Sequence, residues 1–205
     1  GKMTPREIYG LEVGELEERV LDHWPGLAQA CAFAKDRHEG QERKKGGPYV
    51  AHPFRVALLL KEEGGLDDEG LACAALLHDL VEDTPTSHEE IRKGFGSRVS
   101  DLVRSVTQPE RAAGETKFER NMRSFEALRW EGRDAQILRS ADRLDNLTTA
   151  KGAFSAEREA EYVRESRDGI LPLALAVNTP LYHALAAAIE ELDSTAAPGP
   201  GGDGS

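Results

Sequence analysis

Several residue types are scarce in this chain of 205 residues, and each scarcity excludes a class of protein. The only two cysteines, Cys31 and Cys73, lie inside apolar helical patterns, so we predict buried thiols and a reducing compartment rather than a disulfide framework. Long apolar runs are also lacking. The strongest, residues 170–177, is too short to span a bilayer, and the N-terminus lacks a secretory signal. We therefore predict a cytoplasmic protein without a membrane partner.

Basic residues are fewer than acidic ones. The chain has 26 lysines and arginines against 37 aspartates and glutamates, which gives a net charge of −11. A general nucleic-acid binder carries a basic face, so this balance argues against a nucleic-acid partner. It also means that an anionic small substrate could bind only where positive charge is concentrated locally.

Strand signals are few, whereas helical periodicity runs through most of the chain. We predict a single all-α domain over residues 1–194, a bundle of about eight to ten helices. Residues 195–205 are rich in proline and glycine, which predicts a disordered tail. The main predicted helices cover residues 26–38, 53–64, 67–82, 97–107, 117–129, 133–150, 156–167 and 171–193. The last of these is predicted to bend at Pro180. A short helix is predicted to start at Ser87, where Glu90 completes a capping-box pattern, and residues 108–116 are predicted to form a polar loop.

The stretch ALLHDLVEDT, residues 75–84, ends a helix that is apolar on nearly every side. It nevertheless carries four polar residues: His78, Asp79, Glu82 and Asp83. Ionised carboxylates in a buried helix cost several kcal/mol each unless something pairs with them. A divalent metal ion is the partner that this pattern favours.

Two other segments offer further ligands. His52 stands where a loop enters a helix. Asp142 and Asn146 lie four residues apart on one face of another helix, which is otherwise buried through Ile137, Leu138, Ala141 and Leu144. With His78 and Asp79 they would supply two imidazoles and two carboxylates, a mixed set that suits Mn²⁺, Fe²⁺, Zn²⁺ or Mg²⁺. The alternative is that these are ordinary structural residues, because a His-Asp pair also occurs by chance.

The basic run Arg43-Lys44-Lys45 precedes a Gly-Gly-Pro turn. Such a run is usually a solvated loop, but here it could collect the positive charge that a polyphosphate substrate needs. Tyr49 is interpreted as either core packing or site lining. Arg139 and Arg143 are interpreted as ion-paired helix residues, although either could face phosphate.

Three motifs in this order and spacing carry a resemblance: RHEGQERKKGGPYVAHP (37–53), LLHDLVEDT (76–84) and ADRLDNL (141–147). Together they resemble the hydrolase domain of the RelA/SpoT homologue superfamily, within the HD phosphohydrolases. The length resembles that of the small, stand-alone alarmone hydrolases, which include the metazoan SpoT homologue. The resemblance implies an HD-domain helical bundle and removal of the 3′-pyrophosphate from (p)ppGpp, a small nucleotide, with Mn²⁺ as the usual metal.

The resemblance also implies roles for individual residues. It implies that His52, His78, Asp79 and Asp142 are metal ligands and that Glu82 and Asp83 position or activate the attacking water. It further implies that Arg43 lies near the base and Lys44 near phosphate. The remaining nucleotide contacts would be Asn146, Thr149 and, at a different spacing from its counterpart, Tyr162.

Two positions depart from the family pattern. Asp145 stands where the family often has histidine or tyrosine, and Thr148 where it has arginine. An added negative charge and a lost positive one beside the nucleotide could change base preference or weaken affinity for the 5′-phosphates. Two alternatives therefore stay open: hydrolysis of another nucleotide (an adenosine alarmone, NADPH at its 2′-phosphate or a nucleoside monophosphate) and a catalytically silent nucleotide-binding module. The oligomeric state is not predicted.

Overall fold

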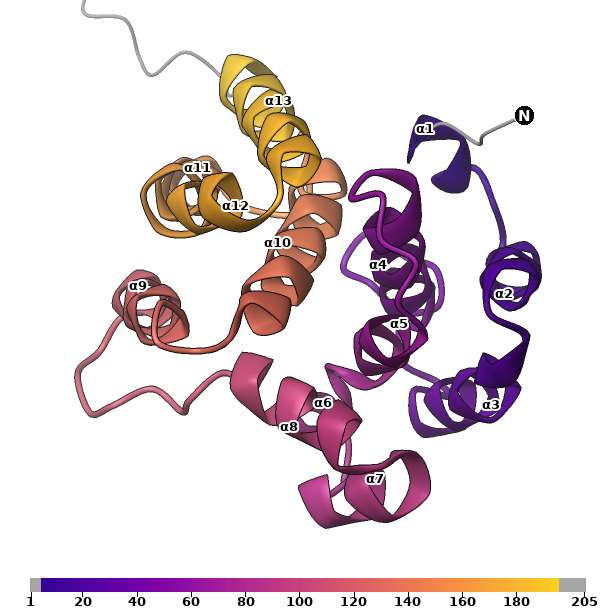
Figure 1. The fold of residues 1–205 in the computed structure, drawn as a ribbon. Helices are drawn as coiled ribbons and strands as arrows, with labels where there is room; N and C mark the ends of the chain where they lie inside the picture. The colour runs from indigo at the N-terminus through magenta and orange to yellow at the C-terminus, as the bar shows by residue number, and fades with distance from the viewer. Residues whose placement is uncertain (1–4, 196–205) are drawn as a thin grey trace, which may run out of the picture.

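A computed structural model describes residues 5–195 of the chain, and their architecture is all-α, as predicted (Figure 1). Within this range ten helices have eight or more residues, and the only β-type pairing is an isolated bridge between Glu42 and Pro48. The predicted tail over residues 195–205 lies outside the described residues, apart from the backbone of Thr195. Over the described residues, no helix combines the length and apolar character that crossing a membrane requires.

The described helices follow one another in this order: α1 (Pro5–Ile8), α2 (Val13–His23), α3 (Ala28–Arg37), α4 (Ala51–Glu62), α5 (Glu69–Leu77), α6 (Leu80–Asp83), α7 (His88–Phe95), α8 (Ser97–Val106), α9 (Lys117–Leu128), α10 (Arg133–Thr148), α11 (Ala156–Glu165), α12 (Leu171–Val177) and α13 (Thr179–Thr195). A 3₁₀ turn, Pro25–Leu27, precedes α3, and a π-helical turn, Ser166–Ile170, joins α11 to α12. The helices α1 and α2 were not predicted from the sequence.

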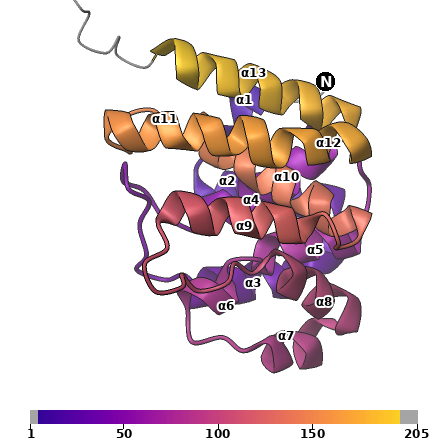
Figure 2. The same cartoon turned by 90° about the vertical axis from the view of Figure 1, so that its left-hand side faces the viewer.

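The helix α10 lies at the centre of the bundle (Figure 1). It packs against α4 on one side and against α12 and α13 on the other, while α5 packs on α4 and α8 on α5. Turned by 90°, α9, the α11–α12 pair and α13 lie one above another on the near side (Figure 2). The helix α10 thus meets α4 and α5, which both end far before it in the sequence.

The buried side chains form one hydrophobic core, and α4 and α10 lie deepest in it. Every residue over 52–60 on α4 is buried, as is every residue over 137–145 on α10. Helices buried on all sides have no face where a charged side chain can reach bulk water. The polar residues within these two runs must therefore find partners inside the protein.

Local capping explains where several helices start. The predicted capping box is present at α7, where Ser87 Oγ accepts from the backbone N–H of Glu90 at 3.1 Å. At α5 the Asp68 carboxylate accepts from the N–H of Leu71 at 3.1 Å. Each cap satisfies an amide that the first turn leaves unpaired.

The predicted helix over 67–82 is interrupted in the structure. The helix α5 ends at Leu77, and α6 begins at Leu80. Between them Asp79 has φ −94° and ψ −6°, outside the α-helical values. On a continuous helix neighbouring residues diverge by about 100°. The interruption instead brings the side chains of His78 and Asp79 to the same cluster, described below.

The predicted bend at Pro180 is a full break two residues earlier. Asn178 is extended, with φ −158° and ψ 103°. Its Oδ1 accepts from the N–H of Leu181 at 3.0 Å and its Nδ2 donates to the carbonyl of Gly64 at 3.0 Å. Pro180 has no N–H to donate within a continuous helix, whereas the first turn of a new helix needs no such donor. A capped restart at α13 therefore costs less than a bent helix.

Candidate functional site

The structure brings four of the predicted site residues together: His52, His78, Asp79 and Asp142. Each offers one nitrogen or oxygen atom, and these atoms all lie within 4.8 Å of one another. Asp142 Oδ1 lies 2.8 Å from Nε2 of His52 and 3.1 Å from Nε2 of His78. Asp79 Oδ2 lies 3.4 Å from Nε2 of His52. The cluster therefore joins α4, the α5–α6 junction and α10 at one point.

The second nitrogen of each imidazole already has an acceptor. His78 Nδ1 donates to the carbonyl of Ala75 at 2.6 Å, and His52 Nδ1 donates to Asp145 Oδ2 at 2.6 Å. In the neutral form of each ring the proton therefore lies on Nδ1, and the lone pair of Nε2 faces the two carboxylates. Positive charge must lie between these imidazoles and carboxylates. Protons on the two rings can supply it, since against the effect of burial the neighbouring carboxylates raise the pKa of His52 and His78. A divalent metal ion can replace those protons, and this donor set fits one.

The two carboxylates of the cluster are supported from outside. The Tyr49 hydroxyl donates to Asp79 Oδ2 at 2.6 Å, and the Arg139 guanidinium pairs with Asp142. Burial would raise the pKa of Asp142, but Arg139 and the imidazoles hold that pKa well below its usual value. Asp142 is thus ionised at neutral pH, as a metal ligand must be. Of the two interpretations left open for Tyr49, the structure supports site lining. Arg139 is ion-paired, as interpreted from the sequence.

Glu82 and Asp83 lie beside the cluster and line the same cavity of about 180 Å³. Both side chains face the cavity, but the surrounding protein still desolvates their carboxylates and the Asp79 carboxylate repels them. As a result the pKa of Glu82 is raised to about 7 and the pKa of Asp83 to about 6. The Glu82 carboxylate accepts from the backbone N–H of Gln108, in the loop after α8. A carboxylate with a pKa near neutrality and a fixed position can take up a proton.

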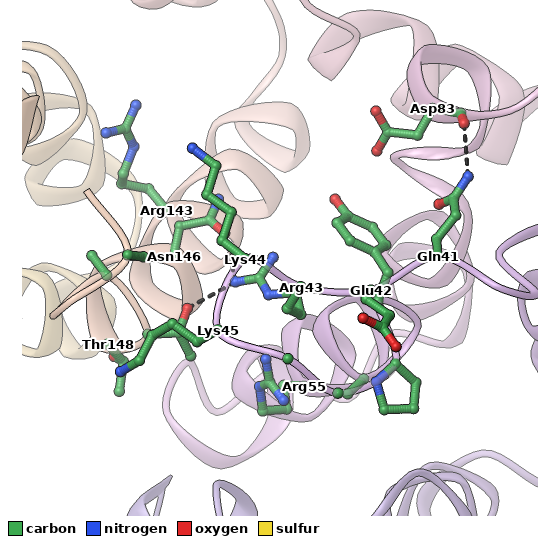
Figure 3. A pocket seen from close by; sticks show the side chains of 18 of the residues that line it. Gln41, Glu42, Arg43, Lys44, Lys45, Arg55, Asp83, Arg143, Asn146 and Thr148 are labelled. Atoms are coloured by element: carbon green, nitrogen blue, oxygen red, sulfur yellow. Dashed lines mark hydrogen bonds between the residues drawn. The ribbon is translucent and has the colours of Figure 1, made fainter. Parts of the chain in front are cut away.

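A second, larger cavity of about 1450 Å³ adjoins the first. Its walls include all the predicted nucleotide contacts: Arg43, Lys44, Asn146, Thr149 and Tyr162. Arg43 Nη2 donates to Thr149 Oγ1 at 2.8 Å and to Asn146 Oδ1 at 3.3 Å, which ties the basic loop to α10. Figure 3 shows Lys44 between Arg143, on the α10 side, and Asp83, on the opposite side of the pocket.

Lys45, the last residue of the predicted basic run, also lines this cavity. Four other basic residues that line it were not predicted from the sequence: Arg55, Lys117, Arg120 and Arg158. Burial and the nearby Arg158 and Lys44 lower the pKa of Lys117. Like charges so close together indicate a surface that an anion would stabilise. One signal was available in the sequence, since Arg158 precedes Tyr162 by four residues and so shares its helix face.

The structure corrects the expectation for Asp145. Its carboxylate is fully buried and pairs with His52 and Arg55, so it does not add a free negative charge beside the nucleotide pocket. Thr148 is exposed and lines the pocket. Asp145 Oδ2 also lies 3.9 Å from Nη2 of Arg43, so this carboxylate reaches the pocket only through its cationic partners. The missing positive charge at Thr148 lies on the pocket wall itself.

An all-α bundle with a buried His-Asp cluster beside a basic pocket defines an HD-type domain. The HD domain family model matches residues 30–176. The chain belongs to this family and, within it, to the hydrolase domains of the RelA/SpoT homologues, as the sequence motifs indicated.

Three relatives place it there. It is 39% identical over 161 residues to guanosine-3′,5′-bis(diphosphate) 3′-pyrophosphohydrolase of Aquifex aeolicus (77% of this chain, 23% of that protein). It is 37% identical over 142 residues to the guanosine-3′,5′-bis(diphosphate) 3′-pyrophosphohydrolase MESH1 of Xenopus tropicalis (66% of this chain, 78% of that protein). The solved structure of a metazoan orthologue of SpoT that hydrolyses ppGpp has a TM-score of 0.71 at 31% identity, covering 80% of this chain and 93% of that one. The chain thus spans less than a quarter of the Aquifex protein and most of MESH1.

Proposed function

We propose that the chain is a metal-dependent hydrolase that removes the 3′-pyrophosphate from (p)ppGpp and gives GDP or GTP and pyrophosphate. One observation carries this proposal: the small cavity at the His-Asp cluster and the basic cavity share wall residues. The shared residues are Tyr49, Asp83, Gln108, Arg139 and Asn146. A nucleotide bound to the basic wall can therefore extend a phosphate group to the cluster. The names of the relatives supply the choice of ppGpp.

His52, His78, Asp79 and Asp142 would hold the metal, for which we propose Mn²⁺. When bound, such an ion lowers the pKa of a coordinated water and polarises a phosphoryl oxygen. Because the ligands are ionised or neutral nitrogen and oxygen donors, other divalent ions can compete for the site.

The chain's own residues would do the remaining chemistry. Glu82, held by the Gln108 amide, accepts a proton from the attacking water, whose oxygen adds to the phosphorus joined to the ribose 3′ oxygen. The bond from that phosphorus to the 3′ oxygen breaks, so the pyrophosphate leaves with the oxygen of the water. The 3′ oxygen takes up a proton from solvent and becomes the 3′-hydroxyl of GDP or GTP. Lys44 and Arg43 offset negative charge on the phosphates. The cytoplasmic location stays a prediction.

The test is a product assay on the metal-free protein with Mn²⁺ added back. With ppGpp we expect GDP and pyrophosphate in equal amounts, and no reaction when a chelator is present. Orthophosphate from NADPH or from a nucleoside monophosphate, with ppGpp left intact, would replace the proposal with the alternative hydrolase. Tight binding of ppGpp without turnover would support the silent module instead.

The replacement Lys44→Met is expected to raise KM for ppGpp about tenfold and to change kcat less. The Lys44 ammonium is an exposed cation at the pocket, and one charged contact of about 1.4 kcal/mol corresponds to a factor of ten in affinity. The rise in KM with added salt should also become shallower, because one screened charge is gone. Steady-state kinetics at two salt concentrations measures both effects.

The matched control is Lys93→Met, an exposed lysine on α7 outside both cavities. It should leave KM within about twofold of the wild-type value, since surface charges away from a site contribute little. Equal KM values for the Lys44→Met and Lys93→Met variants would contradict the assignment of Lys44 as a substrate contact.

A further inference from the structure

We propose that Asp145 is a positioning residue: clamped by Arg55, it holds the imidazole of His52 so that Nε2 is presented to the metal. The proposal rests on the proposed metal site and adds a residue to it. Asp145 is 0% exposed, and its Oδ2 lies 2.6 Å from His52 Nδ1. Fixing the proton on Nδ1 leaves Nε2 free as a ligand, and fixing the ring plane keeps that nitrogen aimed at the cluster.

Arg55 neutralises the charge of this buried carboxylate and fixes its orientation. Its Nε donates to Asp145 Oδ1 at 2.7 Å and its Nη2 to Oδ2 at 3.1 Å, a bidentate arrangement that fixes the carboxylate plane. A lone buried carboxylate would cost several kcal/mol, whereas the guanidinium neutralises it. Arg55 is itself largely buried, although it reaches the edge of the pocket near Arg43 (Figure 3).

Two residues of α4 and two of α10 make two successive layers of contact between these helices. His52 and Arg55 are three apart on α4, and Asp142 and Asp145 are three apart on α10, so each pair lies on one face. His52 meets Asp142 in the metal layer, and Arg55 meets Asp145 in the layer behind it. The rear layer thus braces the front one across the same helix contact.

The two imidazoles of the cluster differ in how they are held. His78 Nδ1 donates to a main-chain carbonyl, that of Ala75, which no side-chain replacement removes. His52 depends on a side chain, Asp145, for the same function. The orientation of His52 can therefore be tested by mutation while that of His78 stays constant.

The experiment compares two double variants that both lack the buried charges. In Arg55→Met/Asp145→Leu no acceptor faces His52 Nδ1, whereas in Arg55→Met/Asp145→Asn the amide oxygen still can accept its proton. Replacing a buried ion pair by apolar groups is often neutral for stability, so both should fold. We expect the Mn²⁺ dissociation constant, measured by titration calorimetry without nucleotide, to rise about 10- to 100-fold in the leucine variant and to stay within a few-fold of wild type in the asparagine variant.

Equal Mn²⁺ affinities in the two double variants would overturn the positioning role. A second measurement needs no variant: in the Zn²⁺-loaded wild-type protein, the Nδ1–H of His52 should give a deshielded NMR signal in slow exchange with solvent. Rapid exchange of that proton, or a proton on Nε2, would also overturn the proposal. If the wild-type protein binds no Mn²⁺, the proposed metal site is contradicted. If the two double variants differ in Mn²⁺ affinity but the wild type does not hydrolyse ppGpp, only the proposed substrate is contradicted.

Discussion

Asp79→Asn is expected to lower kcat/KM for ppGpp by at least about 10³-fold. The asparagine keeps the volume, and its amide oxygen can still accept from the Tyr49 hydroxyl, but one of the two carboxylates facing the imidazoles is lost. A bound metal contributes several kcal/mol of transition-state stabilisation, and about 1.4 kcal/mol corresponds to tenfold in rate. Steady-state assays of pyrophosphate release at saturating Mn²⁺ measure the loss.

The matched control is Asp36→Asn, which removes an exposed carboxylate on α3, and its activity should equal that of the wild type. Calorimetric titration with Mn²⁺ should show that the Asp79 variant binds the metal more weakly, while circular dichroism shows that its helices are retained. An Asp79→Asn variant that keeps activity within tenfold of wild type would contradict the assignment of Asp79 as a ligand.

The architecture and the four clustered residues could be predicted because each rests on a local signal. The apolar residues of α4 and α10 recur on more than one side of each helix, which predicts burial, so the charged residues among them, His52 and Asp142 included, need partners. Charged groups in such helices need a partner, and that requirement alone predicts that they meet. The structure brings them within 4.8 Å of one another, across 90 residues of sequence.

The outer partners could not be predicted, because their pairing depends on how the helices pack. Nothing local to Tyr49 indicates that its hydroxyl reaches Asp79, and nothing local to Arg55 indicates Asp145. Nothing local to Asp145 indicates that its carboxylate is fully buried and paired with His52, Arg55 and Arg43, because its depth depends on how α4 packs on α10. The interruption at His78 and Asp79 was missed because both residues are compatible with a helix.

Glu82→Gln is expected to lower kcat about 10²- to 10⁴-fold and to remove the acidic limb of the pH profile, as loss of a general base does. The base must be ionised, so the wild-type rate should rise with pH through the pKa of Glu82. Desolvation and Asp79 raise that pKa to about 7 in the metal-free protein. A cation in the adjacent cluster favours the carboxylate, so in the Mn²⁺-loaded enzyme the limb should lie at or below about 7.

Asp83→Asn separates the roles of the two acids. Glu82 lines only the cavity at the His-Asp cluster, whereas Asp83 lines both cavities and so lies where substrate and metal site meet. We therefore expect the Asp83 variant to keep the acidic limb and to change KM as well as kcat. If it loses the limb while Glu82→Gln retains it, Asp83 is the base. In that case the Glu82 carboxylate, which accepts from the backbone N–H of Gln108, would only line the cavity.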